Sequence, residues 1–226
     1  MAKILGISGS PRNKSTEYAL GEALKSIESR DGIETSMITL RGKKIAPCNG
    51  CGYCKKNKTW CCLKDDFEPL LKEFMEADAY LFGSPVYAYG PTPQLSAFFS
   101  RMRPLFHVYP ELMRDKIGSA FAVGGTRNGG EEATITAMHN MMMARGINIV
   151  CNEVYGYAGG YIWSKDQGQE GVDADEIGMG GLLKLANKLA DMALIREYGM
   201  KALEEREAAV NERDYGFKRF SGSFKG

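Results

Sequence analysis

The tightest group of reactive side chains in the sequence is a run of cysteines. Five of the six cysteines, Cys48, Cys51, Cys54, Cys61 and Cys62, lie close together. Two-residue gaps let the first three thiolates converge on one metal centre, and Cys61 or Cys62 could supply a fourth. Four sulfur ligands suit zinc or a [4Fe–4S] cluster, and three closely spaced cysteines favour the cluster because zinc usually takes two separated pairs. An unmetallated reactive loop or a disulfide is the plainer alternative.

A second candidate site is a hydroxyl-rich loop near the N-terminus, residues 8–16, called here the phosphate loop. It reads Ser-Gly-Ser-Pro-Arg-Asn-Lys-Ser-Thr and lies between an apolar run and a helical pattern. A helix N-terminus offers free N–H groups and a positive dipole end, which suit a terminal phosphate such as that of FMN. The candidate phosphate ligands are Ser8, Ser10, Arg12, Ser15 and Thr16. The loop lacks the Walker and dinucleotide-binding patterns, and an ordinary helix cap is the simpler alternative.

The elements around these sites predict an α/β fold. Apolar runs predict strands at residues 3–7, 34–40, 78–83, 117–124 and 147–151, and apolar residues at helical spacing predict helices at 16–29, 92–103, 131–145 and 181–198. Asp65 and Asp66 offer an N-cap to another helix. The alternation predicts a five-stranded, doubly wound parallel sheet with a cysteine-rich insertion after its second strand. Ligands of such sheets bind at the carboxyl ends of the strands, here the loops 8–16, 84–91 and 124–131.

Composition narrows the function classes. The 226 residues carry a net charge of +1, which gives no reason to expect nucleic acid or an anionic membrane as a partner. No apolar stretch is long enough to span a bilayer, and the N-terminus lacks a signal-peptide pattern, so we expect a cytoplasmic protein. We expect one domain over residues 1–200, with the cysteines in a loop at 46–64 (the cysteine segment), and a C-terminal arm at 201–226.

Several remaining features carry weaker expectations. Residues 156–181 are rich in Gly and acidic residues and are expected to form a loop or lid. Cys151 follows an apolar run and is expected to be a core thiol. The apolar face of helix 92–103 and the aromatic residues of the arm predict a homodimer or a homotetramer. Neither His107 nor His139 has a Ser or Asp pattern beside it, so no catalytic side chain is expected.

Three loops resemble those of one known family. Gly-Ser-Pro-Arg-x-x-Ser-Thr from Gly9, Gly-Ser-Pro-Val-Tyr from Gly83, and Gly-Gly-Thr-Arg-Asn-Gly-Gly from Gly124 are similar to the NADPH-dependent FMN reductase branch of the flavodoxin-like fold. The resemblance covers roughly residues 1–200 and implies that the two later loops contact the isoalloxazine ring, with Tyr87 or Tyr89 over one of its faces. The ring contacts that it implies are Pro85, Val86, Tyr87, Gly90, Gly125, Thr126, Asn128, Gly129 and Gly130.

The cysteines followed by Asp-Asp resemble the iron–sulfur flavoprotein family. Its fourth cysteine precedes the Asp pair at the spacing of Cys61, so the resemblance implies Cys48, Cys51, Cys54 and Cys61 as cluster ligands. It also implies an FMN- and [4Fe–4S]-dependent oxidoreductase that takes electrons from ferredoxin or NAD(P)H and passes them to a small oxidant. Two alternatives remain: an FMN or quinone reductase without a cluster, and a redox sensor or carrier with no substrate of its own.

Overall fold

The computed structural model describes residues 1–154 and 156–209. The strands are β1 (Ala2–Ser8), β2 (Ile33–Thr39), β3 (Ala79–Pro85), β4 (Ile117–Gly124), β5 (Asn148–Ile149) and β6 (Gly160–Trp163). The helices are α1 (Ser15–Glu28), α2 (Tyr53–Asn57), α3 (Phe67–Glu76), α4 (Pro93–Arg101), α5 (Arg103–His107), α6 (Glu131–Met143), α7 (Gln169–Asp173) and α8 (Glu176–Ala209). Among these residues, no helix is both long and apolar enough to cross a membrane.

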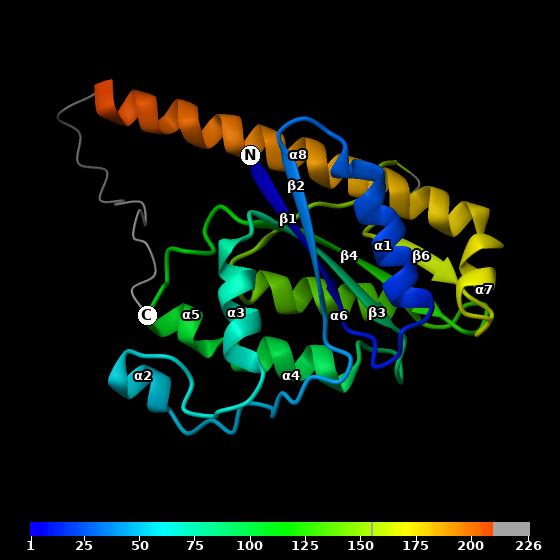
Figure 1. Ribbon diagram of the computed structural model, residues 1–226, viewed down its shortest axis with the longest axis horizontal. Helices are drawn as coiled ribbons and strands as arrows, with labels where there is room; N and C mark the ends of the chain where they lie inside the picture. The colour runs from blue at the N-terminus through cyan, green and yellow to red at the C-terminus, as the bar shows by residue number, and fades with distance from the viewer. Residues whose placement is uncertain (155, 210–226) are drawn as a thin grey trace.

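The sheet is parallel and has the order β2-β1-β3-β4-β5 (Figure 1), which is the flavodoxin-like order. Every residue of β4 is buried, as expected of a central strand covered on both faces. Because the strands are parallel, β1, β3 and β4 end at the same edge: Ser8 pairs with Gly83, and Pro85 pairs with Val123. The predicted doubly wound parallel sheet is therefore confirmed, although it has six strands rather than the predicted five, because β6 also pairs with β4. The three loops suggested by the sequence all begin at this edge.

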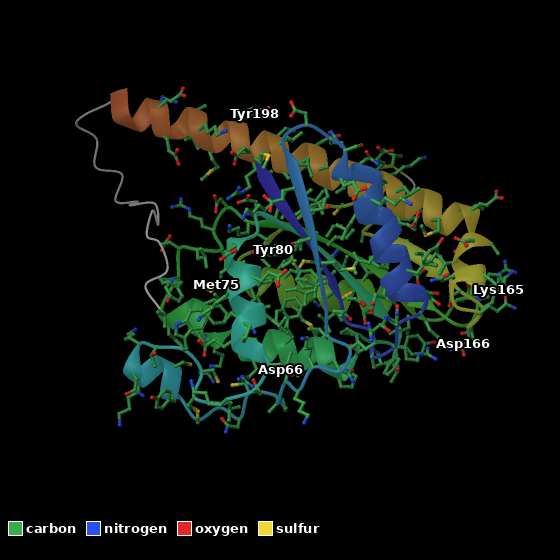
Figure 2. The ribbon with its side chains drawn as sticks, in the orientation of Figure 1. Asp66, Met75, Tyr80, Lys165, Asp166 and Tyr198 are labelled. Carbon is green, nitrogen blue, oxygen red and sulfur yellow. The ribbon has the colours of Figure 1, made fainter. Side chains whose placement is uncertain are left out.

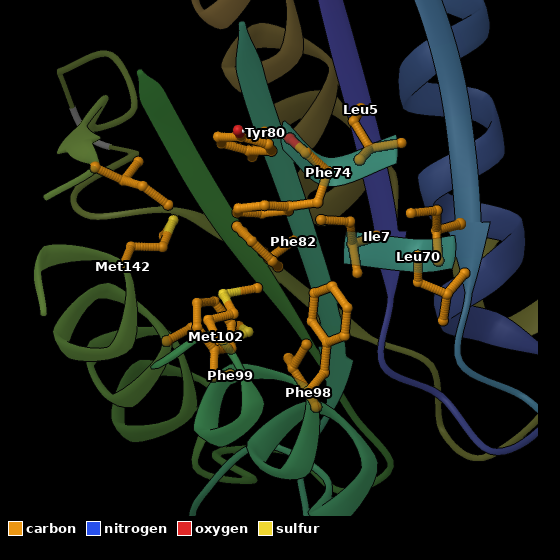
Figure 3. Packing of buried hydrophobic residues seen from close by; sticks show 14 of the residues in the cluster. Leu5, Ile7, Leu70, Phe74, Tyr80, Phe82, Phe98, Phe99, Met102 and Met142 are labelled. Atoms are coloured by element: carbon orange, nitrogen blue, oxygen red, sulfur yellow. Dashed lines mark hydrogen bonds between the residues drawn. The ribbon is translucent and has the colours of Figure 1, made fainter. Parts of the chain in front are cut away.

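Helices bury both faces of the sheet. One apolar cluster joins the sheet to α3, α4 and α6, and the other joins it to α1 and α8. Figure 3 shows the first cluster, where the rings of Phe74 and Tyr80 stack with centroids 4.2 Å apart. Leu95, Phe98 and Phe99 of α4 are buried in this cluster. The chain's own core therefore covers this helix face, so the face gives no support to the expected homodimer or homotetramer, which stays a prediction.

The segment expected to be a lid contains a strand. β6 pairs with Phe121–Gly124 of β4, whereas β5 pairs only with Ile117 and Gly118. The two short strands thus share one edge of β4, and residues 150–159 leave the sheet between them. Cys151 lies in this excursion and is exposed, so the expectation of a core thiol was wrong. A period-based prediction misses β6 because it has four residues and begins at a glycine.

The last helix is longer than predicted. α8 begins at Glu176 and runs through residue 200, the predicted boundary between domain and arm, as far as Ala209. In Figure 1 its C-terminal end extends past the edge of the sheet. The domain boundary stays a prediction, and the arm's aromatic residues Tyr215, Phe217, Phe220 and Phe224 lie outside the described residues.

Candidate FMN site and cysteine pocket

The phosphate loop is fixed by the strand that precedes it and by its neighbours. Gly9 N–H donates to the carbonyl of Gly83 (2.8 Å), and the hydroxyl of Thr92 donates to the carbonyl of Gly9 (2.7 Å). The Ser10 hydroxyl accepts from Arg12 N–H (3.1 Å) and donates to the Arg12 carbonyl (2.8 Å). These bonds fold the loop back toward α1, and the side chains of Ser10 and Thr16 are buried there.

The N-terminus of α1 is open to an anion. Lys14 occupies the cap position and makes no side-chain cap hydrogen bond, so no side chain caps the N–H groups of the first turn from that position. The Ser15 hydroxyl donates to the carbonyl of Gly168 (3.1 Å), and Arg12 lies 3.5 Å from the carboxylate of Asp166. This donor set of N–H groups, hydroxyls and one guanidinium fits a phosphate monoester.

The 84–91 loop forms a tight two-residue turn. Tyr87 and Gly90 pair through both backbone bonds (2.8 and 2.9 Å), and Val86 N–H donates to the carbonyl of Val123 (3.0 Å). Ala88 and Tyr89 both have a left-handed backbone, with φ of 47° and 61°. A turn of this type usually carries Asn or Gly, so Ala88 and Tyr89 are held there at a cost of about 1 kcal/mol each. Such strain is concentrated at functional sites.

The 124–131 loop lies against that turn. A Cβ atom on Gly130, whose φ is 95°, would meet the ring of Tyr89 at 2.9 Å, so the ring packs on this glycine. Asn128 is also left-handed, with φ of 55°. Tyr87 and Tyr89 remain 40% and 71% exposed, which leaves ring surface available to a ligand. The structure therefore brings the two predicted ring loops into contact and anchors the second of them on β4.

The cysteine segment gathers its sulfur atoms in one pocket. All five of its cysteines line this pocket together with Arg101 and Arg103. The Sγ atoms of Cys51 and Cys62 lie 3.8 Å apart. The N–H of Tyr53 and then the Cys62 thiol lower the pKa of Cys51. Within the described ranges, no group of three or more His, Cys, Asp or Glu side chains is arranged to hold a single metal ion.

The two ends of the cysteine segment are tied together at its base. Asp65 accepts from the N–H of Ala46 (3.0 Å), and Asp66 accepts from the N–H of Lys44 (2.8 Å). Burial opposes ionisation of Asp65, but hydrogen bonds from Arg101 and from backbone N–H groups hold its pKa below the usual range. The Asp pair therefore closes the loop, and Asp66, at the cap position of α3, makes no side-chain cap hydrogen bond.

Comparisons with known proteins identify the family. Residues 2–158 match the family model of NADPH-dependent FMN reductases. An iron-sulfur flavoprotein of Archaeoglobus fulgidus is 42% identical over 190 residues, which are 84% of this chain and 96% of that protein. The chain belongs to the iron–sulfur flavoprotein family. It is therefore a flavin-dependent oxidoreductase with FMN as its cofactor.

Another relative agrees with this membership, and a solved structure agrees with the fold. An iron-sulfur flavoprotein of Methanocaldococcus jannaschii is 36% identical over 191 residues, which are 84% of this chain and 96% of that protein. A solved structure titled as RosB with a bound 8-demethyl-8-formylriboflavin-5'-phosphate intermediate has a TM-score of 0.66 and 15% identity, and the match covers 100% of this chain and 94% of that one. At that identity the likeness shows the flavodoxin-like fold alone.

The sequence analysis did not identify several residues that shape the candidate FMN site. Glu131, the first residue of α6, is 7% exposed, and its carboxylate lies beside Gly124 and Gly129. Burial raises the pKa of Glu131, although N–H groups including that of Gly129 hydrogen-bond its charged form. A carboxylate three residues after Asn128 could have been recognised as a support for this loop, because acidic residues are favoured in the first turn of a helix.

The 164–168 turn is the second feature that the sequence did not reveal. Ser164 binds the carbonyl of Gly124 through its N–H (2.9 Å) and its hydroxyl (3.1 Å). Through Asp166 and Gly168 the same turn reaches Arg12 and Ser15 of the phosphate loop. Figure 2 shows Lys165 and Asp166 at the far end of the molecule from the projecting part of α8. This turn thus connects the phosphate loop to the 124–131 loop.

Proposed function

We propose that the chain is an FMN- and [4Fe–4S]-dependent oxidoreductase that takes electrons from ferredoxin or NAD(P)H and passes them to a small oxidant. The main support for the cluster is that the five cysteines of the cysteine segment line one pocket. The donor set supports it, because thiolates are the usual ligands of iron–sulfur clusters. Relatives with 34% to 42% identity that are named iron-sulfur flavoproteins support it too.

In this proposal three loops hold FMN. The N–H groups of the first turn of α1, with Ser8, Ser10, Ser15 and Thr16, bind the phosphate, and Arg12 adds charge. For this the Ser15 hydroxyl exchanges its bond to Gly168 for one to the phosphate. Contacts to the ring come from the two loops that meet at Tyr89 and Gly130, and the ring residues assigned are Pro85, Val86, Tyr87, Gly90, Gly125, Thr126, Asn128, Gly129 and Gly130.

The cluster ligands in this proposal are Cys48, Cys51, Cys54 and Cys61. When bound, FMN supplies electron transfer singly or in pairs, and a [4Fe–4S] cluster supplies it one electron at a time. The chain's own residues bind and orient the two groups. Electron transfer needs no acid or base side chain, so none is assigned. The surrounding arginines offset the negative charge of four thiolates.

Assembly and location complete the proposal. The exposed apolar side chains of Ile195, Tyr198 and Leu203 on the C-terminal part of α8 are a surface that a homodimer or a homotetramer would bury. Figure 2 places Tyr198 on that part of the helix. The cytoplasmic location stays a prediction. A monomer in light scattering at micromolar concentration would contradict the assembly.

One experiment tests the central proposal. Protein purified without oxygen and supplied with iron and sulfide should contain FMN, about four irons per chain and a broad brown absorption beside the flavin bands. NADH, NADPH and reduced ferredoxin are then offered as donors, with a quinone or oxygen as acceptor. Flavin with turnover but no iron would identify an FMN or quinone reductase without a cluster. A full complement of both groups with no turnover would identify a carrier.

The assignment of the fourth ligand has its own matched pair of variants. We expect Cys61→Ala to lose most of the iron or to leave a three-iron species, and Cys62→Ala to keep the full amount. FMN should stay bound in both because its loops lie elsewhere. Iron and flavin per chain and low-temperature EPR measure this. The reverse pattern would move the ligand to Cys62, whose sulfur is the one close to Cys51.

A further inference from the structure

Arg101 is a fully buried arginine at the base of the cysteine segment. It is the last residue of α4, and its side chain is 1% exposed. Its Nη1 donates to the carbonyl of Ala46 (2.8 Å) and to Asp65 (2.7 Å), and its Nη2 donates to the carbonyl of Leu63 (3.3 Å) and to Asp65 (3.2 Å). One side chain thus holds both ends of the segment to the scaffold.

The same guanidinium borders the sulfur pocket. Arg101 lines the pocket and interacts electrostatically with the thiol of Cys61. Its Nε is buried without a hydrogen-bond partner among the described residues, and its carbon Cζ lies 4.8 Å from the centre of the Phe67 ring. The Phe67 ring therefore covers one face of the positive charge, which is paired with the Asp65 carboxylate and borders the sulfur pocket.

Other cations near the sulfurs are placed differently. Arg103 interacts electrostatically with Cys51, and Arg145 with Cys48, but both of these arginines are only half-buried, whereas Arg101 is buried. The lysines of the segment, such as Lys55 and Lys56, are exposed. Water and salt screen an exposed charge strongly and a buried one weakly. Arg101 is thus the cation of this pocket whose field should act most strongly on a sulfur ligand.

We infer that Arg101 is a positioning residue for the cluster: it fixes the base of the cysteine segment and places a buried positive charge beside Cys61. This inference rests on the proposed function. A positive charge next to a thiolate ligand stabilises the state of the cluster that carries the extra electron, so it raises the reduction potential. Because Arg101 holds the residues on both sides of the cysteines, it also limits how far the ligands can separate when iron is lost.

The test compares Arg101→Gln with Arg101→Lys in protein loaded anaerobically with FMN, iron and sulfide. Arg101→Gln removes the charge and should shift the cluster's potential, followed by EPR, to a more negative value. Its iron affinity should fall about tenfold, as for other residues that orient metal ligands. Arg101→Lys keeps the charge but not the two-pronged geometry, so its potential should stay near that of the parent while its iron affinity falls.

A matched control separates this effect from the loss of any buried ion pair. Arg196 also donates to two carboxylates, Asp78 (2.9 Å) and Asp115 (2.8 Å), which lie just before the amino ends of β3 and β4. Arg196→Gln should lower stability without moving the potential. Asp65→Asn provides a second variant should Arg101→Gln fail to fold: it leaves the arginine charge less neutralised, so the potential should shift to a less negative value.

The outcomes are distinct. An unchanged potential in Arg101→Gln, or a shift equal to that of Arg196→Gln, overturns the inference while leaving the cluster in place. A shift toward more negative values in Asp65→Asn overturns it as well. A parent protein that retains FMN but takes up no iron overturns the proposed function, and the inference with it.

Discussion

The FMN loops and the cysteine segment are held in place in different ways. The FMN loops continue from strands, so the sheet sets their positions, and backbone bonds such as Gly9 to Gly83 and Val86 to Val123 fix them. The cysteine segment contains a single helix of five residues and depends on side chains from outside it. Ser100 binds Cys48 N–H (3.1 Å), and Arg101 with Asp65 closes its base. A mutation can therefore damage the cysteine segment without loss of the FMN loops, or the reverse.

The largest expected effect comes from opening the base of the cysteine segment. Asp65→Ala leaves the guanidinium of Arg101 buried without its carboxylate, which should lower the free energy of unfolding by about 3 kcal/mol. Iron content should fall to a small fraction of the parent value, while FMN per chain is retained. Denaturant unfolding and metal analysis measure the two. If FMN and iron are lost together, the two regions are not independent.

The second prediction addresses the phosphate loop. Ser10→Ala with Thr16→Ala removes two buried hydroxyls from the N-terminus of α1, each with an expected contribution of about 1 kcal/mol. We expect FMN affinity to fall by about 10- to 100-fold, since charged hydrogen bonds to phosphate are stronger than neutral ones. Fluorescence titration of the apoprotein with FMN measures this. Unchanged affinity would show that the phosphate binds elsewhere, and the iron content should stay at the parent level.

This difference between the regions also explains what the sequence could predict. The strand–loop–helix pattern is local, so the phosphate loop and the two ring loops could be located from residues that are neighbours in the chain. Arg101 and Asp65 are 36 positions apart, and Ser15 and Gly168 are 153 apart. Contacts of this kind follow from the packing of α4 and of the 164–168 turn, which no local pattern encodes. The same holds for Cys151, whose exposure depends on where β5 leaves the sheet.

The third prediction concerns strain within the FMN loops. Ala88→Gly relieves a left-handed alanine and should raise the free energy of unfolding by about 1 kcal/mol. Ala144→Gly is the matched control, because Ala144 has φ of −64° and glycine there should instead lower stability. Urea unfolding of both variants gives the comparison. Equal losses would mean that the turn at Ala88 is not strained in solution.

The smallest expected effect is the pH dependence of stability that Glu131 contributes. Its sign follows from the difference in proton affinity between the folded and the unfolded chain. Because burial raises the pKa of Glu131, the folded chain binds this proton more tightly than the unfolded chain does. The contribution of Glu131 is therefore most favourable below the ordinary glutamate pKa, near about 4.3, and is lost as the pH rises through the higher folded value. Glu131→Gln has no such proton, so the stability of the variant relative to the parent should rise across that range. Melting temperatures of both proteins from acid to neutral pH test this, because a constant offset from altered hydrogen bonds to Gly129 and Gly130 does not depend on pH. A difference that shrinks as the pH rises would show that the N–H groups of the 124–131 loop outweigh burial and hold the carboxylate charged.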